Sequence, residues 1–206
     1  MIRRLRLRSL ARNMRLSALP RDTRGATLVE FAIVAPVMIL LILGICDLAY
    51  QVYAQSILNG AMQKAGRDST IQGAASSASA IDAKVSNMVK KVAANATFTF
   101  TRKNYDSFSL IKPEPFTDTN NNGVRNTGEC FTDVNGNGTW DSDPGLAGQG
   151  GANDVTVYTV TVNYPHLFPV TKLFGWSAKQ TITASTLLKN QPYASQSVVT
   201  PKQVCT

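Results

Sequence analysis

The chain has 206 residues, enough for one modest domain and a membrane segment, and its formal net charge is +8. Eight arginines and a single aspartate lie in residues 1–25, so nearly all of the net charge belongs to this leader. Because residues 26–206 are almost neutral, the basic composition does not indicate a nucleic-acid-binding surface, and we expect no nucleic acid among the partners.

An uncharged apolar run follows the leader, from Phe31 to Cys46, with Glu30 before it and Asp47 after it. As a helix this run would span about 24 Å, and the apolar residues on either side extend it across a hydrocarbon core of roughly 30 Å. We therefore predict one membrane-spanning helix whose membrane part covers about residues 26–54. A secretory signal peptide is the alternative, but no convincing small-x-small cleavage site follows the run.

The distribution of charge around this helix predicts its orientation. Positively charged flanks remain in the cytoplasm, so residues 1–25 form a basic cytoplasmic leader and the C-terminal part of the chain is exported. We therefore expect a single crossing of the membrane, with the C-terminal domain outside the cytoplasm.

The border between leader and helix reads RGATLVEF over residues 24–31, with Gly25 ending the basic segment and Glu30 in the fifth place after it. This border resembles the type IV prepilin signal, which a membrane aspartic peptidase cuts after the glycine on the cytoplasmic side. The run VEFAIVAP, residues 29–36, resembles more closely the TadE-like family, and the resemblance covers about residues 24–66. That family comprises minor pilin-like components of the tight-adherence (Flp) pilus machinery.

The resemblance implies roles for three residues at this border. Cleavage after Gly25 would make Ala26 the first residue, and Glu30 would neutralise the α-amino group of Ala26 in a neighbouring subunit. The alternative for Glu30 is a place at the headgroup boundary, with its carboxylate in water. The resemblance also implies a bacterial inner membrane, with the C-terminal domain in the periplasm or outside the cell. The implied partners are inner-membrane lipid, a prepilin peptidase, other pilin-like subunits and the pilus assembly machinery.

The helix is predicted to continue beyond the membrane part, over residues 26–72 in all, because small and apolar residues recur there at helical spacing. This stripe comprises Ala54, Ile57, Leu58, Ala61, Met62 and Ala65. Residues 81–92 predict a second amphipathic helix, and segments rich in β-branched and aromatic residues predict strands over residues 97–101, 155–164 and 180–187. We therefore expect an α+β domain over residues 73–206 with a short antiparallel sheet.

Between the first two predicted strands lies an internal repeat, FTDTNNNG at 116–123 and FTDVNGNG at 131–138. Residues 118–129, here called loop one, match the full D-x-[DN]-x-[DN]-G-x5-E pattern of EF-hand-type calcium loops. In this pattern alternate oxygens converge on one cation, and the glycine permits a sharp turn. The predicted ligands of loop one are Asp118, Asn120, Asn122, the carbonyl of Val124, Asn126 through a water, and a bidentate Glu129.

Residues 133–144, here called loop two, follow the same spacing but are predicted to form the weaker site. The candidate ligands are Asp133, Asn135, Asn137, the carbonyl of Thr139, Asp141 and, because Pro144 at the twelfth position cannot ligate, Asp143. We expect calcium as the cofactor of this tandem insertion, residues 116–145, with a dissociation constant of roughly 10⁻⁴–10⁻³ M for loop one. A solvated loop without metal is the alternative.

Cys130 and Cys205 both lie in the exported part, where a disulfide persists, and they are the candidate pair. The single histidine, His166, has no nucleophile motif beside it, and we expect no enzyme. The leading hypothesis is a minor pilin or pseudopilin in the assembly of a tight-adherence pilus. The alternative is an uncleaved, membrane-tethered module for calcium-dependent adhesion or binding.

Overall fold

The computed structural model describes residues 25–69, 78–168, 170–173, 175–190 and 199–205. It contains two compact units, Met1–Gly44 and Ile45–Thr206. The predicted cytoplasmic leader lies outside the described residues except for Gly25, and so do residues 70–77, which include the end of the predicted long helix.

The helix α1 comprises the 44 residues Ala26–Ser69. Its first part carries large apolar side chains on all sides, and Leu28, Phe31 and Ile33 are 70–72% exposed. A helix that is apolar all round is stable only inside a protein core or in lipid. Among the described residues one helix, over Thr27–Asp68, is long and apolar enough to cross a membrane. The length and composition of α1 thus indicate a single-pass membrane protein.

The unit Ile45–Thr206 combines the later part of α1 with a second helix and two antiparallel sheets. The order of its elements is α2 (Ala78–Lys90), β1 (Thr97–Tyr105), the 3-10 turn η3 (Phe108–Leu110), β2 (Cys130–Asp133), β3 (Leu146–Ala147), β4 (Val155–Pro165), α3 (Val170–Leu173), β5 (Lys179–Lys189) and β6 (Lys202–Cys205). The larger sheet has the strand order β3-β1-β4-β5, and β2 pairs with β6 in the second sheet.

The predicted α+β class is confirmed by the long apolar helix, the second helix and the antiparallel sheets. The three predicted strands correspond to β1, β4 and β5, and each extends further than its sequence pattern indicates. The strands β2, β3 and β6 contain only four, two and four residues, too few for an alternating pattern to predict them.

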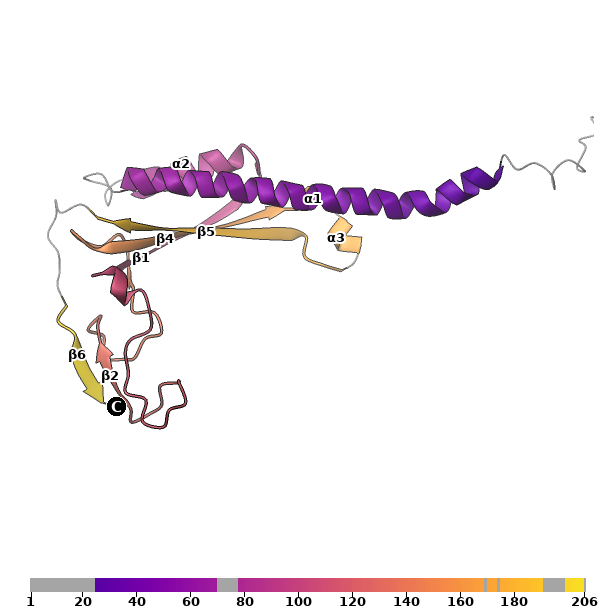
Figure 1. Ribbon diagram of the computed structural model, residues 1–206. Helices are drawn as coiled ribbons and strands as arrows, with labels where there is room; N and C mark the ends of the chain where they lie inside the picture. The colour runs from indigo at the N-terminus through magenta and orange to yellow at the C-terminus, as the bar shows by residue number, and fades with distance from the viewer. Residues whose placement is uncertain (1–24, 70–77, 169, 174, 191–198, 206) are drawn as a thin grey trace, which may run out of the picture. The chain divides into compact units, whose positions relative to one another are not determined.

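The core of this unit lies between the two helices and one face of the larger sheet (Figure 1). The predicted stripe on α1 is buried there, with Ala54 and Leu58 fully covered and Ala65 4% exposed. Side chains alternate across a strand, so every second residue of β4 faces the helices. The same core cluster contains residues of α2 (Ile81, Val85, Val89), β4 (Tyr158, Val160, Val162, Tyr164) and β5 (Ile182, Ala184, Leu188).

A charged network fastens α2 to the sheet. The guanidinium of Arg102 on β1 donates to both carboxylate oxygens of Asp82 on α2, at 2.5 and 3.1 Å. The hydroxyl of Tyr158 on β4 donates to the same carboxylate at 2.5 Å, and the guanidinium lies 4.2 Å from the centre of the Tyr158 ring. Burial, together with the bond to Asp82, raises the pKa of Tyr158. The half-buried carboxylate of Asp82 therefore has a cationic partner and a neutral donor.

Contacts between α1 and the rest of this unit begin at Asp47. Its carboxylate pairs with Nδ1 of His166 and accepts the backbone N–H of Leu167 at 3.0 Å. One turn later, the hydroxyl of Tyr50 donates to the carbonyl of Val92 at 3.0 Å. Residues 47–54, which we assign to the membrane part from the sequence, thus also contribute contacts to the folded unit.

The burial of Leu58 generates a prediction about stability. Leu58→Ala removes a fully covered side chain between α1 and the sheet, and we expect the free energy of unfolding to fall by about 2–5 kcal/mol. The measurement is chemical denaturation of the full chain in detergent, followed by circular dichroism. Lys64→Ala on the same helix is the control, because Lys64 is exposed and its loss should change little. Equal effects of the two substitutions would contradict this packing.

Candidate functional site

Two regions of the chain carry the residues that the sequence singles out: the start of α1 and the paired loops of residues 113–145. At the start of α1, a Cβ added to Gly25 would meet nothing within 4 Å, so packing within the described structure does not require glycine there. Glu30 is exposed on α1 and takes part in none of the ion pairs of the described residues. Within the described residues, neither Gly25 nor Glu30 has a packing or ion-pair role that would account for its presence.

Loop one folds around the carboxylate of Asp118. One oxygen of Asp118 accepts the backbone N–H of Gly123 at 2.7 Å, and the other accepts that of Asn122 at 3.2 Å. The side-chain oxygens of Asn120 and Asn122 each accept the N–H two residues further on, at 3.1 and 2.9 Å. Gly123 has a φ of +76°, a conformation that favours glycine. The sequence pattern therefore places successive side-chain oxygens along the inside of a tight turn.

Loop two repeats this arrangement around Asp133. Its two carboxylate oxygens accept the N–H groups of Gly136 and Gly138 at 2.7 and 2.8 Å. The side-chain oxygens of Asn135 and Asn137 accept the N–H two residues further on, at 3.1 and 2.7 Å.

The two loops also share their unusual backbone conformations. Gly136 and Gly138 in loop two have φ values of +77° and +78°. The equivalent residues of the first copy, Asn121 and Gly123 in loop one, have φ values of +57° and +76°. The internal repeat of the sequence is thus a repeat of structure.

Glu129 closes loop one. It is 3% exposed, and its Oε1 accepts both the N–H and the hydroxyl of Thr119, at 3.0 and 2.9 Å. Its Oε2 accepts the N–H of Asn126 at 2.8 Å. The bond from the Asn126 backbone, followed by those from Thr119, lowers the pKa of Glu129 below its ordinary value. The predicted twelfth ligand of loop one is therefore an ionised carboxylate turned into the loop.

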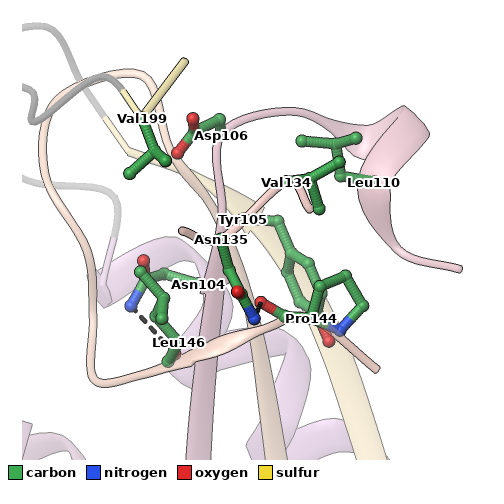
Figure 2. Close-up of a pocket in the computed structure, with 9 residues that line it drawn as sticks. All are labelled: Asn104, Tyr105, Asp106, Leu110, Val134, Asn135, Pro144, Leu146 and Val199. Atoms are coloured by element: carbon green, nitrogen blue, oxygen red, sulfur yellow. Dashed lines mark hydrogen bonds between the residues drawn. The ribbon is translucent and has the colours of Figure 1, made fainter. Parts of the chain in front are cut away.

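The predicted ligands at the end of loop two are arranged differently. One oxygen of Asp141 accepts the side-chain amides of Asn135 and Asn137, at 2.8 and 2.6 Å. The amide of Asn135 also points to the carbonyl of Pro144, at 3.3 Å (Figure 2).

Asp143, the candidate substitute for Pro144, is held by β1. Its carboxylate pairs with Lys103 and accepts the hydroxyl of Tyr105 at 2.6 Å. Burial opposes its ionisation, but the bonds from Lys103 and Tyr105 outweigh that and lower the pKa of Asp143. Both partners are on β1, so the carboxylate of Asp143 is bound to that strand in this structure.

The structure adds a carboxylate that the sequence interpretation does not include. Glu114 is 1% exposed and accepts the N–H groups of Val134 and Asp141, at 2.8 and 3.0 Å. Its carbonyl accepts the indole N–H of Trp140 at 2.9 Å. Glu114 lies outside the loop pattern, but it precedes Phe116 as Glu129 precedes Phe131, so a repeat extended slightly at its start would have included it.

A disulfide and a short second sheet hold the two loops. Cys130 and Cys205 form a disulfide, and they are opposite each other in the β2–β6 pair. Phe116 and Phe131 form an isolated antiparallel bridge between the two copies of the repeat. The two loops are therefore paired with each other, and they are joined to β6 by strand pairing and by the disulfide.

The described residues offer little space for an organic ligand beside these loops. The pocket lined by Tyr105, Val134, Asn135 and their neighbours has a volume of about 20 Å³, room for about one water molecule (Figure 2). Within the described ranges, no three His, Cys, Asp or Glu side chains gather as a group that could hold a metal. The calcium-loop pattern permits asparagine at its third and fifth positions and uses a backbone carbonyl at its seventh, so loop one has only two carboxylates among its predicted ligands, Asp118 and Glu129.

Comparison with known proteins gives one match. Residues 25–67 match the family described as TadE-like protein, which confirms the resemblance seen at residues 24–66. No curated protein and no solved structure matches the chain. The matched segment is the start and the larger part of α1, and it does not include the paired loops.

The disulfide next to Glu129 generates a second prediction. Cys205→Ser should lower the free energy of unfolding by about 2–4 kcal/mol, because the bond closes a segment of 75 residues. The measurement is thermal unfolding of the full chain in detergent with and without a reductant. Cys46→Ser is the control, since Cys46 is a free thiol on α1. If the reductant lowers the melting temperature of Cys205→Ser as much as that of the wild type, the bond is not the cause.

Proposed function

Because residues 25–67 form a TadE-like segment, we propose that this protein is a minor pilin or pseudopilin-like structural component in the assembly of a tight-adherence (Flp, type IV-like) pilus. The match to that family, on a helix apolar enough to cross a membrane, is the observation that carries the proposal. The family implies association with the pilus machinery and with other pilin-like subunits.

We propose that the arginine-rich leader stays in the cytoplasm and is removed there by a prepilin peptidase. The open surroundings of Gly25 support this, because the glycine is not needed for packing within the described chain. A residue without a Cβ lets an extended backbone enter a narrow peptidase cleft. Cleavage after Gly25 leaves a chain that begins with Ala26 and carries a free amino group at the start of α1.

The exposed carboxylate of Glu30 supports a second part of the proposal. An unpaired carboxylate in a membrane is costly and is usually paired with a cation. The α-amino group of an unperturbed peptide has a pKa of about 8, so a new amino group at Ala26 would be largely charged at neutral pH. Pairing of Glu30 with Ala26 of a neighbouring subunit would neutralise both groups and fix the axial offset between adjacent helices.

The paired loops favour a second candidate function, an uncleaved membrane-tethered module that binds partners through calcium. The arrangement of oxygens around Asp118 and the enclosed carboxylate of Glu129 support a calcium ion in loop one. A calcium-stabilised domain is compatible with both candidates. Removal of the leader therefore separates them, because only the pilin component requires it.

The N-terminus of the protein in native membranes tests the proposed function. We expect Edman sequencing to begin at Ala26 and the intact mass to lack the leader. Gly25→Leu should leave the chain uncut, because the larger side chain blocks the cleft. Glu30→Gln should be cut normally but should assemble few or no pili, counted by electron microscopy.

Gly44→Leu is the matched control, because a Cβ at Gly44 also meets nothing within 4 Å in the described structure. Its leader should be removed as in the wild type. An intact leader on the wild-type protein in cells that assemble pili would contradict the pilin component and favour the tethered module.

A further inference from the structure

The contacts of Glu129 define what a twelfth-position glutamate does in these loops. In loop one, Glu129 reaches back to the second and ninth positions, Thr119 and Asn126, whose N–H groups it accepts at 3.0 and 2.8 Å. Its own N–H donates to the carbonyl of Asn126 at 3.1 Å. Three hydrogen bonds thus connect one glutamate with two fixed positions of the loop.

Glu114 makes the same three hydrogen bonds with loop two. Its Oε1 accepts the N–H of Val134 and its Oε2 that of Asp141, the second and ninth positions of that loop. Its own N–H donates to the carbonyl of Asp141 at 3.0 Å. In both glutamates, Oε1 accepts the N–H of the second loop position and Oε2 accepts that of the ninth. Glu114 therefore lies in loop two where Glu129 lies in loop one, although it comes before both loops in the sequence.

The pairing of the two copies explains how Glu114 reaches loop two. The N–H of Thr117 donates to the carbonyl of Cys130, and the N–H of Thr132 donates to that of Pro115, both at 2.8 Å. Thr117 and Thr132 are equivalent residues of the repeat, and so are Pro115 and Cys130. The copies thus face each other with a local two-fold relation, and each brings its glutamate to the loop of the other.

Three buried carboxylates of the paired loops have no cationic side chain as an ion-pair partner among the described residues. Glu114, Glu129 and Asp133 are only 1%, 3% and 4% exposed, and none of them takes part in the ion pairs of the described residues. Their carboxylates accept hydrogen bonds from backbone N–H groups and from the hydroxyl of Thr119. A buried carboxylate is costly unless a cation or metal compensates it. Asp82, elsewhere in the same unit, has Arg102 for this purpose.

We propose that the loops bind two calcium ions as a reciprocal pair, with Glu114 as the bidentate carboxylate of loop two in place of Pro144. The inference rests on the calcium binding proposed above for loop one, whose residues match the complete calcium pattern. Each loop then supplies one aspartate at its first position, one glutamate from the start of the other copy, and amide and carbonyl oxygens. Such a flexible set of oxygens suits calcium better than magnesium, which demands strict octahedral geometry.

The stoichiometry of calcium binding to the full chain in detergent tests the inference. Isothermal titration should give two calcium ions per wild-type chain, one for Glu114→Gln and one for Glu129→Gln. The affinity of the lost site should fall by more than about tenfold, the usual loss when a partner in a metal site is removed. Asp143→Asn is the matched control and should keep two ions, because its carboxylate is bound to β1.

Terbium luminescence identifies which loop is emptied. Trp140 lies in loop two, and its indole donates to the Glu114 carbonyl, so terbium in that loop should be excited through Trp140. We expect Glu114→Gln to lose this emission and Glu129→Gln to retain most of it. Circular dichroism in EDTA checks that each variant is folded. If Glu114→Gln is not folded, Glu114→Asp, which keeps the charge but shortens the side chain, should show the same selective loss.

Several results would overturn the inference. If Glu114→Gln binds two ions with unchanged affinity, Glu114 is not the carboxylate ligand of loop two. If only Asp143→Asn loses an ion, that ligand is Asp143. A single ion in the wild type that only Glu129→Gln removes would leave calcium in loop one and refute the site in loop two. No calcium at millimolar concentration would refute both loops, and it would leave the pilin component intact, because cleavage at Gly25 is measured separately.

Discussion

A helix that continues from lipid into a folded domain must change its surface from apolar on all sides to apolar on one side. In α1 this change takes place around Asp47. Before it, large apolar side chains from Leu28 to Ile45 are exposed in every direction. After it, the buried residues form a single stripe from Ala54 to Ala65 that packs on α2 and the sheet. Because the later part of α1 supplies one layer of the core, the folded unit is not an independent domain on a tether. Removing that part of the helix would expose the face of the sheet that it covers.

Carboxylates in the folded unit have two kinds of surroundings. Asp82 is compensated by Arg102 and the hydroxyl of Tyr158, so the pair carries no net charge and can serve as a permanent link between α2 and the sheet. The carboxylates of the paired loops are instead surrounded by backbone N–H groups, which carry only partial charges. Hydrogen bonds from N–H groups favour the ionised form of a carboxylate but leave its negative charge in place. The Asp82 network is therefore structural, whereas the paired loops are suited to an exchangeable cation.

Periodicity in the sequence predicts the parts of the fold that are long and regular. The stripe of α1, the helix α2 and the strands β1, β4 and β5 follow from it, because each repeats its pattern several times. The pairing of β2 with β6 could not be predicted, since it depends on two short segments 75 residues apart at their cysteines. The ligand pattern likewise assigns loop one to its own residues, but loop two is closed by Glu114, outside the pattern. Asp143 is next to Pro144 in sequence, yet Lys103 and Tyr105 hold it on β1.

The backbone N–H groups of Thr117 and Thr132 each donate to a carbonyl of the other copy, which gives the copies a local two-fold relation. This relation limits the changes in length that the insertion can accept. Loop one contains its own glutamate, Glu129, but Glu114 closes a loop only when the second copy is present, so the arrangement at loop two depends on the duplication. Lengthening the chain between Glu114 and Glu129 would displace both glutamates from the loops that they contact, because the same interval along the chain sets the position of both. We therefore expect insertions to be tolerated only outside residues 114–141, where they leave the contacts of Glu114 and Glu129 with the loops unchanged.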